Sequence, residues 1–565
     1  MIILGINHYF HDSTACLLVD GKIAVAIEEE RLNRRKHTRE FPERAIRLCL
    51  SEAGLTPADV DAVAVSIKPD KNLPQRLAYG IRNAPNAVSF FTFEFGHWAL
   101  KQTDFRRWYR KTWPSGGPKV HFVPHHMAHA VGSFLASPFD DAAILSIDGA
   151  GEWSTSFLGE GRGTRVRMFS ESFFPDSLGS FYEVPTQYCG FIPNTDEGKT
   201  MGLASFGDPD RFGDIVDRLV TVDEEGRIHI DLEMFNYQFW GPDRFNDRFV
   251  ETFGPARAGF HAPIEKHHED VAAAFQQTLE ERALEMCAHL RRQSRSRYLV
   301  ISGGVALNSV MNGRILREAG FDDIYVMPAA GDNGTALGAA LYVDSTVMGN
   351  PRRHVHDDPY LGTAYTDDYI EKLITTSKLT ASKHEDIAGT VAQLLADGKI
   401  VGWFQGRMEI GPRALGNRSI LADPTLPHMK DKINAEVKHR ESFRPFAPSV
   451  IAEATGTYFD ITTESPFMLR VCDVLPDMRE RLPAITHVDG TARLHTVKKD
   501  VNPLYHDVIS RFGQLSGVPV VLNTSFNVQG EPIVESPEQA LRCFATTGLD
   551  AVAMGSWLVE KGSAF

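Results

Sequence analysis

The sequence predicts an α/β fold whose first part is a duplicated unit. Residues 2–7 are apolar and rich in β-branched side chains, and residues 13–27 have the pattern of a β-hairpin with a tight turn. The same strand, turn and hairpin pattern returns at residues 142–158. In each copy the hairpin starts six residues after the polar residue that ends the strand, from 7 to 13 and from 148 to 154. Two such copies predict two turns that face one cleft, and two unrelated hairpins are the alternative.

Two glycine-rich turns further along the chain favour the duplication. Residues 298–301 and 324–327 are short apolar stretches, and each continues through a glycine-rich turn into a helical stretch. The turns have the sequences Ser-Gly-Gly-Val-Ala-Leu-Asn at 302–308 and Pro-Ala-Ala-Gly-Asp-Asn-Gly at 328–334. Such turns favour a bound anion or nucleotide, because backbone N–H groups at a helix N-terminus point at the ligand.

A change in composition near residue 355 predicts a domain boundary. Residues 348–360 are rich in Pro, Gly, His and charged side chains, and the apolar periodicity lapses there. We therefore expect a first domain over residues 1–355 and a second α/β domain over 356–565, which has the size of an ordinary domain. Apolar stretches at 400–404 and 518–522 predict strands in the second domain.

The composition excludes several classes of protein. Of the 565 residues, 43% are hydrophobic and 23% are charged, as in ordinary globular proteins. The net charge of −14 disfavours nucleic acid as a partner, because a negative field repels a polyanion. The six cysteines form no C-x-x-C pair, and we expect reduced thiols. The N-terminus lacks a basic signal region and no apolar stretch could span a bilayer, so we expect a cytoplasmic protein with no membrane partner.

Two histidines and two aspartates form a candidate metal site. His125 and His129 are four positions apart in a stretch with the pattern of an apolar helix, so they share one face. Asp148 and Asp332 each follow a predicted strand and stand beside glycines. Two imidazole nitrogens and two carboxylate oxygens would suit Fe(II), Mn or Zn. Helix capping or core packing is the alternative for the histidine pair, because that spacing alone is a weak signal.

Lys199 follows a glycine in a polar loop with the sequence Asp-Glu-Gly-Lys-Thr. A P-loop would require a glycine at position 193, where Pro193 stands, so this class of phosphate site is excluded. A phosphate contact and a solvated surface lysine both stay open. The local pattern alone favours the surface lysine.

The second domain carries the densest cluster of cations in this acidic chain. Residues 406–419 and 438–449 place arginines and a lysine among Gly, Pro and Phe rather than on a polar helix. Guanidinium groups and backbone amides suit phosphate or carboxylate oxygens, so we favour an anion pocket over a solvated face. The strand predicted at 518–522 is followed by Ser525 and Asn527, which either line this pocket or cap the next turn.

Eleven stretches, in order along nearly the whole chain, resemble the O-carbamoyltransferase family, which includes nodulation-factor, cephem and antibiotic-tailoring carbamoyltransferases. They are FHDSTACL, EEERLNRRKH, HHMAHA, SIDGAGE, EGKTMGLASFG, SGGVALNS, GDNGTALGAA, GPRALGNRSI, KHRESFRPFAPS, ARLHTV and LNTSFN. The resemblance implies a first domain of the actin-like ATPase superfamily, similar to the threonylcarbamoyl-transferring domain, and a YrdC-like second domain.

The resemblance also implies a reaction in two steps. The second domain would convert carbamoyl phosphate and ATP, with Mg2+, to carbamoyl adenylate, and the first would transfer the carbamoyl group to a small-molecule alcohol of secondary metabolism. His11 resembles the residue that deprotonates the alcohol, for which an unperturbed pKa of about 6.5 is suitable, with Asp12 orienting it. The cage of His125, His129, Asp148 and Asp332 would hold a metal, with Fe(II) favoured over Zn or Mn.

Two sets of binding residues are implied by the same resemblance. Those for the adenylate are Gly149, Gly151, Lys199, Gly303, Gly304 and Asn308. Those for carbamoyl phosphate and the phosphates of ATP are Arg413, Arg418, Lys438, Arg440, Arg444 and Arg493, completed by Ser525 and Asn527.

Several alternatives stay open at this point. A sugar-kinase-like phosphotransferase shares the actin-like architecture but leaves the basic second domain unexplained. A tRNA-modifying threonylcarbamoyl-type transferase is closer in fold, and the net charge of −14 argues against it. A hydrogenase-maturation enzyme would bring zinc-binding C-x-x-C pairs, and a nucleotide sensor would bind ATP without turnover. A homodimer is compatible with the sequence. For the aromatic-rich residues 70–118, we favour core packing over an acceptor-binding wall.

Overall fold

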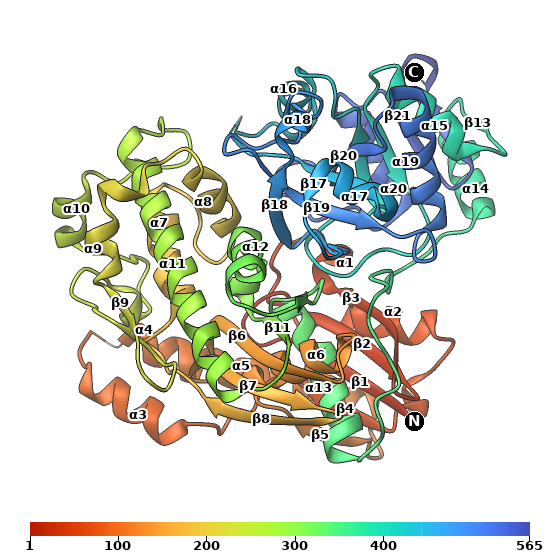
Figure 1. Cartoon of the computed structure of the whole chain (residues 1–565). Coiled ribbons are helices and arrows are strands. Elements are labelled where there is room, and N and C mark those ends of the chain that lie inside the picture. Colours follow the sequence, from red (N-terminus) through yellow and green to blue (C-terminus); the bar gives the residue numbers. More distant parts are fainter. Residues whose placement is uncertain (87, 442, 565) are drawn as a thin grey trace. The chain divides into compact units, whose positions relative to one another are not determined.

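The computed structural model describes residues 1–86, 88–441 and 443–564, and the chain divides into two compact units (Figure 1). The first unit comprises Met1–Glu29 and His37–His356. The second unit comprises Glu30–Lys36 and the chain from Asp357 onward. A short segment from early in the sequence is therefore built into the second unit.

The first unit contains two five-stranded sheets with the same topology. In each sheet the first strand pairs with an antiparallel meander on one side and with two parallel strands on the other. One sheet has the order β3-β2-β1-β4-β5, with β1 Ile2–Asn7, β2 Thr14–Val19, β3 Lys22–Glu28, β4 Ala62–Val65 and β5 Lys119–Phe122. The other has the order β8-β7-β6-β11-β12, with β6 Asp141–Gly151, β7 Ser154–Arg162, β8 Arg165–Ser170, β11 Tyr298–Ser302 and β12 Asp323–Val326.

This repeated topology is the duplicated arrangement that the sequence predicts. The alternative of two unrelated hairpins is wrong, because the strand order and the strand directions repeat over all five strands. The predicted fold class is confirmed: a duplicated α/β unit is followed by a second α/β unit.

Two helices lie between the two sheets. Helix α13 (Thr335–Tyr342) packs on β1, β2 and β4, and helix α6 (His125–Ala136) packs on β6, β7 and β11. The two helices also pack against each other (Figure 1). They approach closely at Gly132 and Gly338, where a Cβ on Gly338 would overlap the carbonyl oxygen of Ala128. This contact sets the position of α6, which carries two of the candidate metal ligands.

The remaining elements of the first unit surround these layers. Helices α7 and α11 cover the outer side of the second sheet, and α2 packs on β2 and β3. The helices are α2 Glu43–Glu52, α3 Leu73–Arg82, α4 Val88–Phe91, α5 Trp98–Thr112, α7 Leu178–Tyr188, α8 Glu197–Ala204, α9 Gly213–Asp217, α10 Asp247–Phe253, α11 Lys266–Gln293 and α12 Ser309–Glu318. A separate two-stranded sheet pairs β9 (Val220–Val222) with β10 (Ile228–Ile230). Helix α1 spans Glu29–Asn33, and all of it after Glu29 belongs to the second unit.

The second unit is built on one mixed ten-stranded sheet of order β13-β22-β21-β14-β15-β20-β16-β19-β18-β17. Its strands are β13 Ser382–Lys383, β14 Val401–Phe404, β15 Arg418–Ala422, β16 Ala447–Ile451, β17 Phe459–Asp460, β18 Arg470–Val474, β19 Thr491–Val497, β20 Val520–Ser525, β21 Ala551–Met554 and β22 Trp557–Glu560. Its helices are α14 Asp367–Ser377, α15 Ile387–Ala396, α16 Met429–Ile433, α17 Thr455–Tyr458, α18 Pro476–Arg479, α19 Pro503–Ser516, α20 Pro537–Thr546 and α21 Lys561–Ala564.

The sheet of the second unit has an apolar core on each face. Trp403 and Phe404 are neighbours on β14 and point to opposite faces, as the two-residue period of a strand requires. Trp403 joins Tyr505 and Phe512 under α15 and α19, and Phe404 joins Phe526 on the other face. A central strand buried on both faces explains why residues 400–404 form a continuous apolar stretch.

Two expectations about apolar segments can be compared with the structure. Phe90, Phe105 and Trp108 of the aromatic-rich stretch are buried, as core packing requires. Across the described residues, none of the helices combines the length and the apolar character needed to cross a membrane.

We predict that Gly338→Ala destabilises the first unit. The added methyl group would meet the backbone of α6, and overpacking of this kind costs about 1–3 kcal/mol in free energy of unfolding. Denaturant unfolding measures the change. Gly213→Ala is the matched control, because a Cβ at Gly213 meets nothing within 4 Å. A Gly338→Ala variant as stable as the control would contradict the close contact.

Candidate active site

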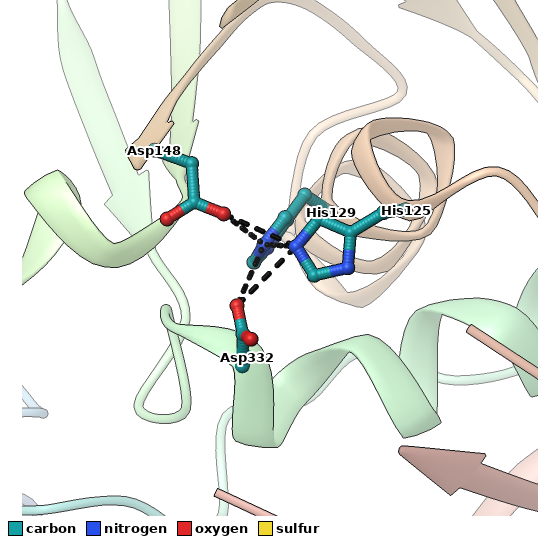
Figure 2. A group of neighbouring side chains, drawn as sticks. All are labelled: His125, His129, Asp148 and Asp332. Carbon is teal, nitrogen blue, oxygen red and sulfur yellow. Dashed lines mark hydrogen bonds and ion pairs between the residues drawn. The ribbon is translucent and has the colours of Figure 1, made fainter. Parts of the chain in front are cut away.

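Four side chains from three elements meet in the first unit (Figure 2). His125 and His129 project from the first two turns of α6, and Asp148 lies in β6. The pairing of β6 with β7 is irregular between Ile147 and Gly151, and Asp148 stands in this irregular stretch. Asp332 begins a short 3-10 turn that leads into α13. We call His125, His129, Asp148 and Asp332 the metal cage.

The donor atoms of the cage converge on one buried point. His125 Nε2 is 3.1 Å from Asp148 Oδ2 and 3.3 Å from Asp332 Oδ1. His129 Nε2 is 3.4 Å and 3.7 Å from the same two oxygens, and the two Nε2 atoms are 3.1 Å apart. Each of the four residues is at most 8% exposed.

The cage fits a transition-metal ion by its donor chemistry. Two imidazole nitrogens point the same way from one helix face, and each aspartate turns one carboxylate oxygen towards them (Figure 2). The other oxygen of Asp148, Oδ1, accepts the N–H of Gly304 at 3.0 Å, which fixes the carboxylate and leaves Oδ2 for the centre. Such a shell suits Fe(II), Mn or Zn.

His125 and Asp332 each shift the pKa of the other towards its charged form. Burial alone would lower the pKa of His125, but Asp332 and Asp148 raise that pKa well above 6.5. Burial raises the pKa of Asp332, but His125 and His11 outweigh this and lower it to about 2. In the absence of an ion His125 therefore holds a proton. A metal ion must displace this proton to bind.

Glu152 holds His125, the first residue of the candidate cage, in place. Its carboxylate oxygen Oε1 accepts the N–H of His125 at 3.0 Å and that of Lys68 at 2.7 Å, which caps the N-terminus of α6. Glu152 is 3% exposed and has a positive φ of 52°. At Gly151 a Cβ would overlap the ring of His125, so this glycine is required by packing.

His11 lies beside the metal cage in a constrained turn. The ring of Phe10 is 6.1 Å from that of His125, centroid to centroid. Asp12 adopts a left-handed conformation with φ 51° and accepts from both neighbouring histidines, His11 Nδ1 at 3.0 Å and His37 Nδ1 at 2.8 Å. One carboxylate thus orients two imidazole rings.

The electrostatic environment of His11 differs from the one assumed from the sequence. Burial alone would lower the pKa of His11. The charges of Asp332 and Asp12 outweigh burial and raise this pKa from 6.5 to about 10. The expectation of an unperturbed value near 6.5 does not hold for the ion-free protein, because three carboxylates lie within electrostatic range.

The residues expected to bind the adenylate differ in their surroundings. Gly149 has open space around its Cα, whereas Gly303, with φ 90°, is packed against the backbone of Ile147. Asn308 caps α12 and exchanges hydrogen bonds with Gln276. Lys199 is 9% exposed and pairs with Asp196 at 2.8 Å, so it is not a solvated surface lysine.

In the second unit four arginines form a cationic cluster, which consists of Arg413, Arg440, Arg444 and Arg493. Burial lowers the pKa of Arg493, and the charges of Arg413, Arg440 and Arg444 lower it further. The pKa of Arg413 is lowered to about 10 by burial and by Arg444. A bound anion would relieve the repulsion between these guanidinium groups.

Lys438, Ser525 and Asn527 are brought together beside these arginines. The ammonium of Lys438 contacts the carbonyl oxygens of Ser525 and Asn527 and donates to Asn527 Oδ1 at 2.8 Å. Burial lowers its pKa, and Arg440 lowers it further. The three residues form one connected group, as the pocket hypothesis requires.

Arg418 is placed differently from the other cations. It is fully buried, its guanidinium donates to backbone carbonyls including Gln405 at 2.6 Å, and it stacks on Phe404 at 3.7 Å. We therefore assign it to the support of the loop 406–417 and not to an anion. Glu409 supports the same loop, because its Oε1 accepts backbone N–H groups of Leu415, Asn417 and Arg418.

Sequence reasoning missed three residues that shape these sites. Glu152 follows the glycine turn at 149–151, and His37 lies in one of the family-like stretches, so both had a local signal. Glu409 had none, because a carboxylate among arginines is expected to form an ion pair rather than to hold backbone N–H groups.

Comparison with known proteins gives matches along the chain. A family model described as Carbamoyltransferase N-terminus matches residues 2–341, and one described as Carbamoyltransferase C-terminus matches residues 392–561. The uncharacterized protein sll1178 of Synechocystis sp. is 39% identical over 99% of this chain and 96% of its own length. The nodulation protein NolNO of Sinorhizobium fredii is 37% identical over 99% of this chain and 80% of its own. The 3'-hydroxymethylcephem-O-carbamoyltransferase of Amycolatopsis lactamdurans is 34% identical over 65% of each.

We predict that His129→Ala lowers the amount of bound metal. Loss of one imidazole from a buried four-residue shell removes one of its four ligand atoms, which weakens the hold on an ion. Elemental analysis of purified protein measures the metal content. His121→Ala, on β5 and outside the cage, is the control. Unchanged metal content in His129→Ala would rule out the ligand assignment.

Proposed function

This chain belongs to the carbamoyltransferase family, and from that premise we propose that it is an ATP-dependent O-carbamoyltransferase acting on a small-molecule alcohol. The observation that carries the proposal is the metal cage with His11 beside it, since an ion held by the cage would activate an electrophile next to a histidine that could then act as a base. A relative named as a 3'-hydroxymethylcephem-O-carbamoyltransferase supports a hydroxyl group as the acceptor. Biosynthesis of a secondary metabolite is the context we infer.

We assign the activation step to the second unit. Water converts carbamoyl phosphate to carbamate and phosphate. A carbamate oxygen then attacks the α-phosphorus of ATP, the bond from that phosphorus to the bridging oxygen breaks, and Mg2+-bound pyrophosphate leaves. The product is carbamoyl adenylate. The cluster of Arg413, Arg440, Arg444 and Arg493 supports this step, because its mutual repulsion is relieved by phosphate groups.

We assign the transfer step to the first unit. The oxygen of the alcohol attacks the carbamoyl carbon, its proton passes to Nε2 of His11, and the bond to the adenylate oxygen breaks, which releases AMP. Asp12 holds His11 through Nδ1 and leaves Nε2 to face the acceptor. An adenylate is a good leaving group, and this overcomes the low reactivity of the carbamoyl carbon towards an alcohol.

The cage of His125, His129, Asp148 and Asp332 would hold the metal ion in this scheme, and Fe(II) is our first choice over Zn or Mn. When bound, the ion supplies a Lewis acid next to the carbamoyl group. Asp332 and Asp148 raise the pKa of His11, and a cation held between them would lower that pKa towards the range of a general base. Gly149, Gly303 and Gly304 are proposed to face the adenylate.

Incubation of the protein with ATP, Mg2+ and carbamoyl phosphate, without acceptor, tests the activation step. We expect mass spectrometry to detect carbamoyl adenylate and pyrophosphate. The variant Arg444→Ala should form the adenylate at least about tenfold more slowly, because one guanidinium is removed from the cluster. Arg511→Ala, exposed and paired with Asp386, is the control. Absence of both products from a folded, metal-loaded sample would overturn the proposal.

His11→Asn tests the transfer step separately. This variant should still form carbamoyl adenylate but should transfer the carbamoyl group about 10²- to 10⁴-fold more slowly, because Asn cannot accept the proton. Liquid chromatography with 3'-hydroxymethylcephem as the acceptor probe and supplied carbamoyl adenylate measures the transfer. His229→Asn, an exposed histidine paired with Asp223, serves as the control. Transfer at the rate of the unmodified protein would remove His11 from this role.

A further inference from the structure

Three buried polar side chains connect the metal cage to the turn that carries His11. Asn7 ends β1, Ser66 follows β4, and Thr335 is the first residue of α13. The Oγ1 of Thr335 lies 2.6 Å from the carbonyl oxygen of Asp332 and 2.9 Å from Ser66 Oγ. Ser66 Oγ donates to Asn7 Oδ1 at 3.2 Å. We call Asn7, Ser66 and Thr335 the polar spine.

At its other end the polar spine holds the turn itself. The amide Nδ2 of Asn7 donates to the carbonyl oxygens of His11 at 3.0 Å and Asp12 at 3.1 Å. Both hydrogens of this amide are therefore directed at the turn, while its oxygen accepts from Ser66. Asparagine is suited to this position because it can donate twice and accept at the same time.

The polar spine is more than an ordinary satisfied network, for two reasons. Asn7, Ser66 and Thr335 are each at most 1% exposed, so loss of the Ser66 hydroxyl would leave the buried Oδ1 of Asn7 without the donor that faces it. The turn that they hold contains Asp12 with φ 51°, a backbone conformation that persists in a non-glycine residue only when its surroundings impose it.

The polar spine also links the two copies of the duplicated unit. Asn7 and Ser66 lie at the carboxyl ends of β1 and β4, adjacent parallel strands of the first sheet. Thr335 and Asp332 belong to the second copy, where they follow β12. The network therefore sets the separation between His11 of one copy and Asp332 of the other.

From this geometry we propose that Asn7, Ser66 and Thr335 are positioning residues for the transfer step. They hold His11 at the distance from the metal cage that the acceptor oxygen and the carbamoyl carbon require. None of the three is itself a ligand of the cage or a proton acceptor. The predicted loss of transfer rate rests on the proposed function. The predicted position of the turn at His11 and Asp12 rests on the hydrogen bonds alone.

Thr335→Val removes the hydroxyl at nearly constant volume and tests the kinetic consequence. We expect the rate of carbamoyl transfer from supplied carbamoyl adenylate to 3'-hydroxymethylcephem to fall about 10- to 100-fold, because misplacement by about 1 Å is enough for such a loss. The KM for the acceptor, the metal content and the rate of adenylate formation should stay unchanged. Thr335→Ser, which keeps the hydroxyl, should restore the rate.

Ser66→Ala provides a second variant in case Thr335→Val does not fold. Its matched control is Ser296→Ala, since Ser296 is also buried in the first unit and bonds a carbonyl at the start of β6, away from the cage. The Ser66→Ala variant should lose transfer rate and the Ser296→Ala control should not. Equal rates in both, or failure of Thr335→Ser to restore the rate lost in Thr335→Val, would overturn the positioning role.

A crystal structure of the metal-loaded Ser66→Ala variant decides the structural consequence independently of activity. We expect the turn at His11 and Asp12 to shift relative to Asp332, and an unmoved turn would overturn the proposal. If the unmodified protein makes no carbamoylated product, the proposed function fails, while the position of the turn in the variant still decides the role of the polar spine.

Discussion

Burial of two carboxylates next to two imidazoles is the constraint on which the first unit depends. An isolated buried carboxylate is costly, so Asp148 and Asp332 require compensating positive charge, from a proton on His125 or from a bound cation. The cage can form only because α6 and α13 approach at Gly132 and Gly338, where a larger side chain would separate them. The close helix contact, the charge balance and the metal hypothesis are therefore consequences of one arrangement.

In the second unit the clustered buried charges are positive rather than negative. Its arginine cluster concentrates positive charge, and Arg493 has its pKa lowered by three other arginines. The loop 406–417, which carries Arg413, is held independently of this charge by Glu409 on backbone N–H groups and by Arg418 on backbone carbonyls. The backbone at Arg413 is therefore held in place in advance, and an anion that bound there would gain attraction without the cost of ordering this loop.

The sequence predicted the parts of this architecture that depend on local pattern. The equal spacing after residues 7 and 148 indicated the duplication, and the interval between His125 and His129 indicated a shared helix face. Contacts between residues far apart in the sequence could not be predicted. The pairing of Asp12 with His37, for example, depends on how a loop folds back, and no local pattern encodes it. The burial of the Arg418 side chain could not be predicted either, because its neighbours Arg413 and Asn417 indicate a loop rather than the start of a buried strand.

Under the proposed function, the charges of the two sites also give a reason for placing activation and transfer in separate units. Carbamoyl phosphate and ATP carry several negative charges that suit four arginines, whereas carbamoyl adenylate keeps a single phosphate and would gain less from such a cluster. In the first unit Asp148 and Asp332 would repel that phosphate, unless a cation in the cage reversed the sign of the local field. A cation held there would also lower the pKa of His11, because it would offset the carboxylates that raise this pKa. In this proposal, occupancy of the cage would couple binding of the activated carbamoyl group to deprotonation of the base.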